Sequence, residues 1–384
     1  MKILHVISSV DSKGGGPIEG VNQLSAVHRD LGIEVEICSL DAPEAACVRI
    51  SQTKVHALGP AYAGYAYSSR LVPWLKMHAH EYDAVIVNGL WQYVGFAVWC
   101  ALAGTATPYF VFPHGMLGTW FKNTYPLKHL KKWLYWPWAE YRVLRDARKV
   151  IFTCDTERLL ARESFWLYKV SEIVSGFGVA APPTNADELV SRFMAQYPQL
   201  LRKRIILFLG RIHEVKGCDL LIEAFAKVAH RDENLYLVIV GPDQIGWAAK
   251  LKEQAETLGI AHRIIWPGML QGDMKWGAFY AAEVFCLPSH HENFGIVVAE
   301  ALACGKPVLI SNKVNIWREI EADGAGLVAD DTLAGTVSNF EIWLAMNQTE
   351  FQAMQARTTA CFENHFHVQR AAERLLEIIR ESSR

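Results

Sequence analysis

Short apolar segments alternate with longer amphipathic segments along almost the whole chain, and this alternation constrains the fold more than any other feature. We expect strands at residues 2–7, 34–40, 84–88, 109–112, 149–153 and 171–174, and again at 204–209, 235–240, 263–266, 284–287 and 307–311. Apolar runs separated by amphipathic helices are typical of parallel sheets that are covered on both faces. Gly176, Gly178 and the pair Pro182-Pro183 interrupt the series. The sequence therefore predicts an α/β fold with two doubly wound parallel sheets.

Composition agrees with two hydrophobic cores. The chain has 384 residues, of which 51% are hydrophobic and 20% are charged. The net charge of −2 argues against a nucleic-acid partner, because there is no basic excess to neutralise phosphates.

Cysteine usage and hydropathy bear on the location of the protein. The eight cysteines are scattered without a Cys-x-x-Cys pair, so we expect them to be reduced and buried, with no zinc site. We expect no signal peptide in the first residues, and no apolar run reaches the roughly eighteen residues that a membrane-spanning helix requires. We expect a cytoplasmic protein.

Two glutamates flank a Phe-Gly turn in the second half of the chain, in the segment from Glu292 to Glu300. If a helix begins at Ile296, Gly295 lets the backbone approach a ligand closely, and the first N–H groups of the helix form an anion site. The carboxylates on either side would accept hydrogen bonds from hydroxyl groups. A sugar nucleotide combines phosphate and hydroxyl groups in this way. The alternative is a pair of solvated surface glutamates.

A glycine turn with two cations lies upstream of this segment. The apolar run 205–209 leads into Gly210 and Arg211, Lys216 follows, and residues 220–228 are amphipathic. Arg211 can bind phosphate oxygens in pairs, and Lys216 adds a mobile positive charge. Together they predict a clamp for the diphosphate that leaves when a glycosyl bond breaks. Taken singly, each could be a solvated loop residue.

These segments resemble the retaining GT-B glycosyltransferases of the large glycosyl transferases group 1 family (family four). That family includes sucrose synthases and bacterial transferases of lipopolysaccharide and exopolysaccharide assembly. The matching stretches are 208–217, 237–242, 265–269 and 284–308, with looser matches at 113–115 and 153–157. The resemblance covers nearly the whole second half of the chain and is looser in the first half.

The resemblance implies two Rossmann-like domains that face each other across a cleft. Residues 1–178 would bind the acceptor, with a terminal helix at 366–384 crossing back to them, and residues 179–365 would bind the nucleotide-sugar donor. The family usually has Pro-Asn-Gly-Val-Asp near the junction, whereas this chain has Ser-Gly-Phe-Gly-Val-Ala at 175–180. Contacts that the family makes through that stretch do not carry over.

The resemblance also implies roles for individual residues. The residues it places at the reaction centre are His114, Arg211, Lys216 and Glu292. The donor-binding residues it implies are Gly15, Gly16, Gly210, Met269, Leu270, Asn293, Phe294, Gly295, Ile296 and Glu300. Glu292 would hold the sugar hydroxyls and Glu300 those of the ribose, while His114 would position the sugar without abstracting a proton. From the residues alone, His114 could equally be a loop histidine with a local partner.

A glycine-rich segment from Lys13 to Gly20 follows the first expected strand. It can approach a ligand at the carboxyl end of a parallel strand, where open α/β sheets place their sites. It is not a dinucleotide fingerprint, because Glu19 stands where the third small residue should pack. By the resemblance, Gly15 and Gly16 face donor and acceptor; the alternative is a flexible loop.

The segment 120–138 interleaves lysines with aromatic residues. Such a helix suits a membrane surface, with lysines at the head groups and tryptophans at the acyl boundary. An inner membrane surface is therefore one expected partner. The alternative is an ordinary helix that packs on the first domain, because Pro126 and Pro137 interrupt a long amphipathic face.

Recognition of the base is open to UDP, GDP and ADP. Met269 and Leu270 could offer backbone groups to the base, and Asp273 could accept from guanine or cap a helix at 274–282.

The function implied is transfer of a hexose, with retention and without a metal, from a GDP- or UDP-sugar to a glycan or lipid-linked acceptor in surface polysaccharide synthesis. No cofactor is expected besides the donor substrate. The alternatives are a GT-B epimerase or phosphorylase, and a sugar-nucleotide-binding scaffold without activity.

Overall fold

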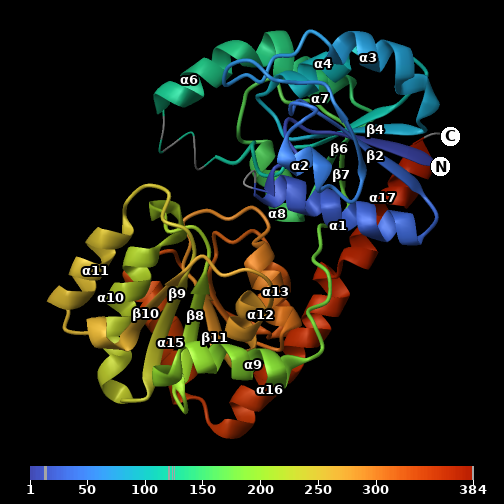
Figure 1. Ribbon diagram of the computed structural model, residues 1–384. Coiled ribbons are helices and arrows are strands. Elements are labelled where there is room, and N and C mark those ends of the chain that lie inside the picture. The colour runs from blue at the N-terminus through green and yellow to red at the C-terminus, as the bar shows by residue number, and fades with distance from the viewer. Residues whose placement is uncertain (13–14, 120–121, 123, 125, 383–384) are drawn as a thin grey trace. The chain divides into compact units, whose positions relative to one another are not determined.

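The computed structural model describes residues 1–12, 15–119, 122, 124 and 126–382. The chain divides into two compact units (Figure 1). The first unit comprises Met1–Ala180 and Val368–Arg384, and the second comprises Ala181–His367. Parts of two segments discussed above lie outside the described residues. They are Lys13 and Gly14 in the glycine-rich segment, and Trp120, Phe121, Asn123 and Tyr125 in the segment 120–138.

The first unit contains a seven-stranded parallel sheet with the order β3-β2-β1-β4-β5-β6-β7. Its strands are β1 (Lys2–Val6), β2 (Glu34–Ser39), β3 (Lys54–Ala57), β4 (Ala84–Asn88), β5 (Tyr109–Phe112), β6 (Lys149–Phe152) and β7 (Glu172–Val174). Val6 is in register with Cys38 on one neighbouring strand and with Val87 on the other. The carboxyl ends of β1, β4 and β5 therefore lie next to one another.

Helices cover both faces of this sheet, because alternate side chains of each strand point to opposite faces. Leu4 packs on the face that carries α3, α4 and α7, whereas Ile3 packs on the face that carries α1 and α17. The helices are α1 (Gly16–Asp30), α2 (Ala46–Arg49), α3 (Leu71–His78), α4 (Tyr93–Leu102), α6 (Pro126–Tyr135), α7 (Tyr141–Asp146), α8 (Asp155–Ala161) and α17 (Val368–Ser382), with a π-helix at Trp136–Glu140 between α6 and α7.

The second unit contains a six-stranded parallel sheet with the order β10-β9-β8-β11-β12-β13. The strands are β8 (Arg204–Leu209), β9 (Leu235–Val240), β10 (Ile264–Gly268), β11 (Val284–Leu287), β12 (Val308–Ser311) and β13 (Gly326–Ala329). Its helices are α9 (Ala186–Gln196), α10 (Cys218–Val228), α11 (Ala248–Thr257), α12 (Gly272–Ala281), α13 (Ile296–Ala303), α14 (Trp317–Asp323), α15 (Leu333–Ala345) and α16 (Gln348–Cys361), followed by a π-helix at Phe362–Phe366. The predicted α/β fold with two parallel sheets is confirmed.

Several local predictions differ from the structure. The strands β3 and β13 were not expected. Asp273 is not a helix cap: α12 begins at Gly272 with Gln271 as its N-cap residue, and Asp273 lies in the first turn. All eight cysteines are free, but the expectation of burial is wrong for Cys100, which is exposed, and Cys47 is only half-buried.

No helix in the described part of the chain combines the length and the apolar character that crossing a bilayer requires.

Candidate active site

In the second unit, the neighbouring strands β10, β9, β8 and β11 end at the same edge of the sheet (Figure 1). Backbone hydrogen bonds join the segments at these strand ends. Gly241 N–H donates to the Gly268 carbonyl at 2.9 Å, and Gly210 N–H donates to the Val240 carbonyl at 2.9 Å. His290 N–H, from the loop after β11, donates to the Val215 carbonyl at 2.8 Å. The segments after β10, β9, β8 and β11 thus form one continuous edge, which is where open parallel sheets bind ligands.

Gly217 lets the loop after β8 lie directly against the loop after β11. Its φ of 66° is in the left-handed region, and a Cβ atom there would lie 2.3 Å from the carbonyl oxygen of Pro288. Only glycine can combine this conformation with this approach. Lys216, the preceding residue, forms an ion pair with Glu292. The structure therefore brings together two residues that are far apart in the chain and that the sequence had assigned to phosphate and sugar.

The backbone around Glu292 is held on both sides. Its N–H donates to the Lys313 carbonyl at 2.9 Å, and its own carbonyl accepts from Asn315 N–H at 3.0 Å. Ser289, two residues before His291, donates its hydroxyl to the Val215 carbonyl at 2.8 Å. These bonds fix the backbone from which the Glu292 side chain extends.

Helix α13 begins where the sequence predicts, at Ile296. Its N-cap residue Gly295 has a φ of 79°, and Phe294 is buried with its ring edge-on to Phe366 at 5.7 Å. Burial of Phe294 anchors the turn, so its backbone and that of Ile296 are the parts that a ligand can use. The first amides of the helix, which have no acceptor within the helix, could bind an anion.

Glu300 lies in the second turn of α13 and is buried, with a side-chain exposure of 6%. Lys275 of α12 donates to its Oε1 atom at 2.5 Å. This lysine neutralises the carboxylate that the sequence assigned to the ribose. The sequence did not predict this contact, because its two residues lie on different helices.

The other predicted donor residues of this unit lie along the same edge. Arg211 and Met269 are exposed, Leu270 and Asn293 are partly exposed, and Gly210 lies against Gly241. Asp273 is paired with Arg192 of α9, with 2.5 Å between Oδ2 and Nη1. That pairing turns the Asp273 carboxylate towards α9.

In the first unit, Gly15 and Gly16 stand at the start of α1, after β1. Gly15 is the N-cap residue with a φ of 78°, and both glycines are exposed. A Cβ atom on Gly15 would meet no described atom within 4 Å, so open space lies beside it. The turn is compatible with a close-lying ligand.

His114 lies at the carboxyl end of β5, also in the first unit, with a φ of 50° that non-glycine residues rarely adopt. Its Nε2 atom lies 3.1 Å from Oδ1 of Asn88, at the end of β4. Burial against protein lowers the pKa of His114 to about 4, so the ring is neutral at pH 7. The sequence did not predict this role of Asn88. The available signal was that Asn88 is a single polar residue at the end of the apolar run 84–88.

Glu157 of α8 holds the backbone next to His114. Its Oε1 atom accepts from Gly115 N–H at 2.5 Å, and its Oε2 atom accepts from the N–H and the hydroxyl of Thr153 at 2.8 and 2.6 Å. The carboxylate is 3% exposed. It thus ties the loop after β5 to the end of β6.

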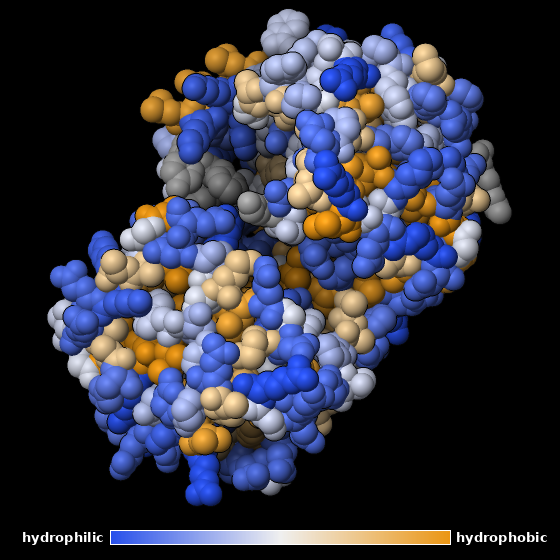
Figure 2. Space-filling model, viewed as in Figure 1, coloured by the Kyte–Doolittle hydropathy of each residue, from blue (hydrophilic) through white to orange (hydrophobic). Residues whose placement is uncertain are grey.

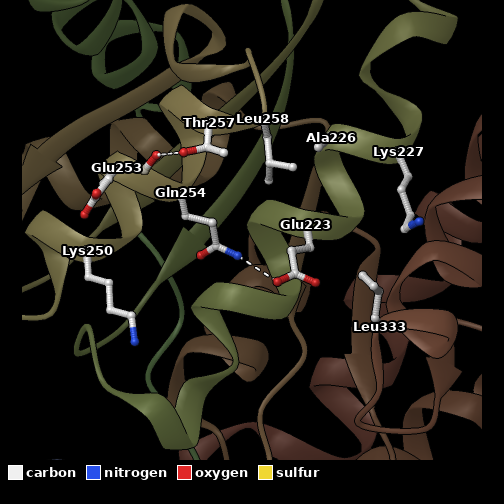
Figure 3. A pocket seen from close by; sticks show the side chains of 9 residues that line it. All are labelled: Glu223, Ala226, Lys227, Lys250, Glu253, Gln254, Thr257, Leu258 and Leu333. Atoms are coloured by element: carbon white, nitrogen blue, oxygen red, sulfur yellow. Dashed lines mark hydrogen bonds between the residues drawn. The ribbon is translucent and has the colours of Figure 1, made fainter.

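A separate pocket lies between α10 and α11 in the second unit (Figure 3). Glu223, Lys227, Lys250 and Glu253 line it, and Gln254 donates to Glu223 at 2.8 Å. Its two lysines and two glutamates balance in charge, and the rest of its lining comes from α10, the end of α11 and Leu333 at the start of α15. A diphosphate fits the carboxyl edge of the sheet better than this pocket.

Comparisons with known proteins agree with this geometry. A crystal structure of HepE from Anabaena in complex with UDP is similar in fold, with a TM-score of 0.80, 18% identity, and coverage of 99% of this chain and 100% of that one. A D-inositol 3-phosphate glycosyltransferase from Rhodococcus opacus is 34% identical over 34% of this chain and 30% of its own length. An uncharacterised glycosyltransferase from Methanocaldococcus jannaschii is 34% identical over 33% of this chain and 31% of its own. The matches to these two curated relatives span about a third of their length.

Two parallel α/β units of this kind define the GT-B fold, the fold of HepE. The sequence model described as glycosyl transferase 4-like domain matches residues 15–170, and that described as glycosyl transferases group 1 matches residues 190–354. Because the two matches together cover most of both units, the chain belongs to the glycosyl transferases group 1 family of GT-B glycosyltransferases.

Proposed function

We propose that the protein is a retaining glycosyltransferase that moves a hexose from a nucleoside-diphosphate sugar to a hydroxyl group of a glycan or lipid-linked acceptor. The observation that carries this proposal is the cluster at the carboxyl edge of the second sheet. There, Lys216 and Glu292 are paired beside the N-terminus of α13, and Glu300 lies buried in the same helix. The arrangement supplies positive charge for a diphosphate and carboxylates for hydroxyl groups on both sides of it.

Each group has a role in this reaction. The first amides of α13 together with Arg211 and Lys216 would bind the diphosphate, and Lys216 would leave Glu292 to do so. The Glu292 carboxylate then accepts from the sugar hydroxyls, as Glu300 does from the ribose. Gly210, Asn293, Phe294 and Gly295 would contribute backbone groups, and Met269 and Leu270 would contact the base.

The acceptor oxygen forms a bond to the anomeric carbon as the bond from that carbon to the phosphate oxygen breaks. The leaving diphosphate takes the acceptor proton, so no protein nucleophile is needed. Catalysis then comes from positioning and from stabilisation of the negative charge on the diphosphate. We propose that the first unit binds the acceptor and the second binds the donor, and that Gly15, Gly16 and His114 keep the roles implied by the resemblance, two donor-binding glycines and a histidine that positions the sugar.

A UDP-sugar is the donor we propose first. Solved structures of the similarly folded HepE contain UDP, UDP-glucose, or UDP with glucose. In this chain, the carboxylate that could have recognised guanine, Asp273, is paired with Arg192. GDP is therefore the second candidate.

Binding of nucleoside diphosphates to the wild-type protein and two variants tests the donor site. We expect one diphosphate to raise the melting temperature by several degrees at concentrations far above its Kd. Glu300→Ala should abolish this shift. Glu253→Ala, an exposed glutamate in the pocket of Figure 3, should leave it unchanged. No shift with any diphosphate at millimolar concentration would contradict the proposal.

Transfer assays distinguish the remaining activities. A glycosyltransferase consumes the sugar nucleotide only with a carbohydrate or lipid-linked acceptor and keeps the anomeric configuration. Turnover without an acceptor would indicate an epimerase, turnover with inorganic phosphate a phosphorylase, and selective binding without turnover a scaffold. We expect EDTA to leave the rate unchanged, because Arg211, Lys216 and the α13 amides supply the positive charge for the diphosphate.

A membrane surface is the partner we propose for α6. No residue of this helix is buried, and Leu127, Leu130 and Leu134 share one exposed face, which appears as hydrophobic surface in Figure 2. Lys128 and Lys131 are exposed on the adjacent face. An apolar stripe bordered by lysines suits an anionic bilayer. The finding supports an acceptor that is linked to lipid, as in assembly of surface polysaccharides at an inner membrane.

Not every basic or aromatic residue of the segment is available for this contact. Lys132 lies over the Trp91 ring at 4.7 Å, and Trp136 is fully buried. We therefore choose Lys128→Glu with Lys131→Glu, and expect binding to anionic vesicles to fall about tenfold or more. Lys227→Glu with Lys250→Glu, on the second unit, is the control with the same charge change. Equal vesicle binding by both double variants would overturn the membrane proposal.

A further inference from the structure

A row of buried polar side chains crosses the carboxyl edge of the first sheet. His5 of β1, Asn88 of β4 and His114 after β5 belong to three neighbouring strands. Asn88 Nδ2 lies 3.2 Å from His5 Nδ1 and 3.1 Å from the Ile86 carbonyl oxygen, while Asn88 Oδ1 lies 3.1 Å from His114 Nε2. The side chains of His5 and Asn88 are 0% and 3% exposed, so water does not compete for these bonds.

The Ile86 carbonyl fixes the orientation of the Asn88 amide. A carbonyl oxygen only accepts hydrogen bonds, so the amide group that faces it must be the NH₂ group. The Asn88 oxygen therefore faces His114, and because this oxygen also only accepts, the hydrogen must be on His114 Nε2. By the same reasoning, His5 Nδ1 accepts and carries no hydrogen.

The His114 ring is neutral when it makes this bond. Burial lowers the pKa of His114 to about 4 and that of His5 to about 3. A neutral imidazole with its hydrogen on Nε2 has a lone pair on Nδ1. Phe112 stacks on the ring at 5.4 Å and Phe177 meets it edge-on at 6.0 Å, which restricts its rotation. His114 remains partly exposed, so a ligand can reach it.

We propose that Asn88 is a positioning residue that holds His114 in the Nε2–H tautomer, so that Nδ1 accepts a hydrogen bond from a hydroxyl group of the sugar substrate. The inference rests on the proposed glycosyl transfer for the identity of the ligand. It excludes His114 as a proton donor to that hydroxyl, because Nδ1 carries no hydrogen. It also assigns a role to Asn88, which makes no direct contact with substrate in this scheme.

Nitrogen-15 NMR of protein labelled at histidine tests the tautomer without any substrate. The wild-type protein should show His114 and His5 with hydrogen on Nε2, and His114→Gln identifies the His114 signals. In Asn88→Ala, the His114 signals should move towards a mixture of tautomers. A wild-type His114 with hydrogen on Nδ1 would overturn the proposal, and so would an unchanged tautomer in Asn88→Ala.

Kinetics of the same variant test the consequence. Asn88→Ala should lower kcat about tenfold or more, with little change in KM for the donor and unchanged nucleoside-diphosphate binding. Asn339→Ala is the matched control, because Asn339 is also a buried asparagine whose Nδ2 donates to a strand carbonyl, that of Ile310 at 3.2 Å. Its kcat should be that of the wild-type protein.

The outcomes separate the two proposals. Absence of transfer by the wild-type protein would contradict the proposed function and leave the tautomer result standing. Unchanged kcat in Asn88→Ala, with transfer by the wild-type protein, would overturn the role of Asn88 alone. Circular dichroism of Asn88→Ala and Asn339→Ala identifies any loss of fold, and the wild-type NMR measurement decides the tautomer even if Asn88→Ala does not fold.

Discussion

Lys275 Nζ lies 2.5 Å from Glu300 Oε1, so a buried carboxylate of the proposed donor site is paired with a cation from a neighbouring helix. Lys216 and Glu292 form a second pair of the same kind in the same unit. Isolated carboxylates are costly to bury, and a nearby cation reduces that cost. The two lysines therefore stabilise the carboxylates of the proposed donor site, and hydroxyl and phosphate groups of a bound donor would replace part of these contacts.

Removal of one partner of the Lys275 and Glu300 pair should destabilise the protein. We expect Lys275→Met to lower the free energy of unfolding by about 3 kcal/mol, because the buried Glu300 carboxylate loses the cation that offsets the cost of its burial. Lys275→Met combined with Glu300→Gln should be more stable than the sum of the two single changes predicts. Urea denaturation of the four proteins measures this coupling, and additive effects would show that the pair contributes nothing.

Gly217→Ala should destabilise the loop after β8 by more than the strain of its left-handed backbone conformation alone. Gly217 has a φ of 66°, and a Cβ atom added there would lie 2.3 Å from the carbonyl oxygen of Pro288. Gly246 has a similar φ of 73°, but a Cβ atom added there would meet open space. Gly246→Ala should cost about 1 kcal/mol from left-handed strain. We expect Gly217→Ala to cost about 3 kcal/mol and to abolish nucleoside-diphosphate binding, because Lys216 is displaced. Thermal unfolding with and without diphosphate measures both effects; equal losses in the two variants would rule out the clash.

Glu140→Gln should make the stability of the protein less dependent on pH. Glu140 is fully buried and accepts from Trp91 N–H at 3.1 Å; burial raises its pKa to about 7 from the ordinary 4.5. Between pH 4.5 and 7 the unfolded chain releases this proton and the folded protein keeps it, so stability falls as the pH rises. The full cost, about 3 kcal/mol, is reached above pH 7.

We therefore expect Glu140→Gln to be more stable than the wild-type protein by about this amount at pH 8, and similar to it at pH 4. Denaturation at both pH values gives the comparison. A difference between the two proteins that did not change with pH would contradict the assignment to Glu140.

Glu157→Gln should impair transfer without affecting the donor site. The variant can no longer accept from both Gly115 N–H and Thr153, since one side-chain atom becomes a donor. We expect a loss of about 2 kcal/mol in stability and a kcat about tenfold lower, because the backbone next to His114 is no longer held. Nucleoside-diphosphate binding should remain that of the wild-type protein, which calorimetric titration measures. Weaker binding would indicate that the change spreads beyond the first unit.

Strands in the middle of the two sheets could be predicted from the sequence almost residue by residue. The expected segments 204–209, 235–240 and 284–287 match β8, β9 and β11, because strands buried on both faces are continuous apolar runs. The two strands that were missed, β3 and β13, are edge strands whose residues are half-buried or exposed. An edge strand needs no continuous apolar run, so its sequence carries a weaker signal.

Within the site, the sequence predicts the backbone features that depend only on residues adjacent in the chain. The apolar runs and the glycine that precedes α13 follow from backbone preferences and periodicity. The tertiary structure alone decided the pairs Lys216 with Glu292, Lys275 with Glu300, and Asn88 with His114. The members of each pair come from different loops or helices, and strand order and register bring them together. No spacing along the chain encodes such contacts, because they depend on how whole strands and helices pack.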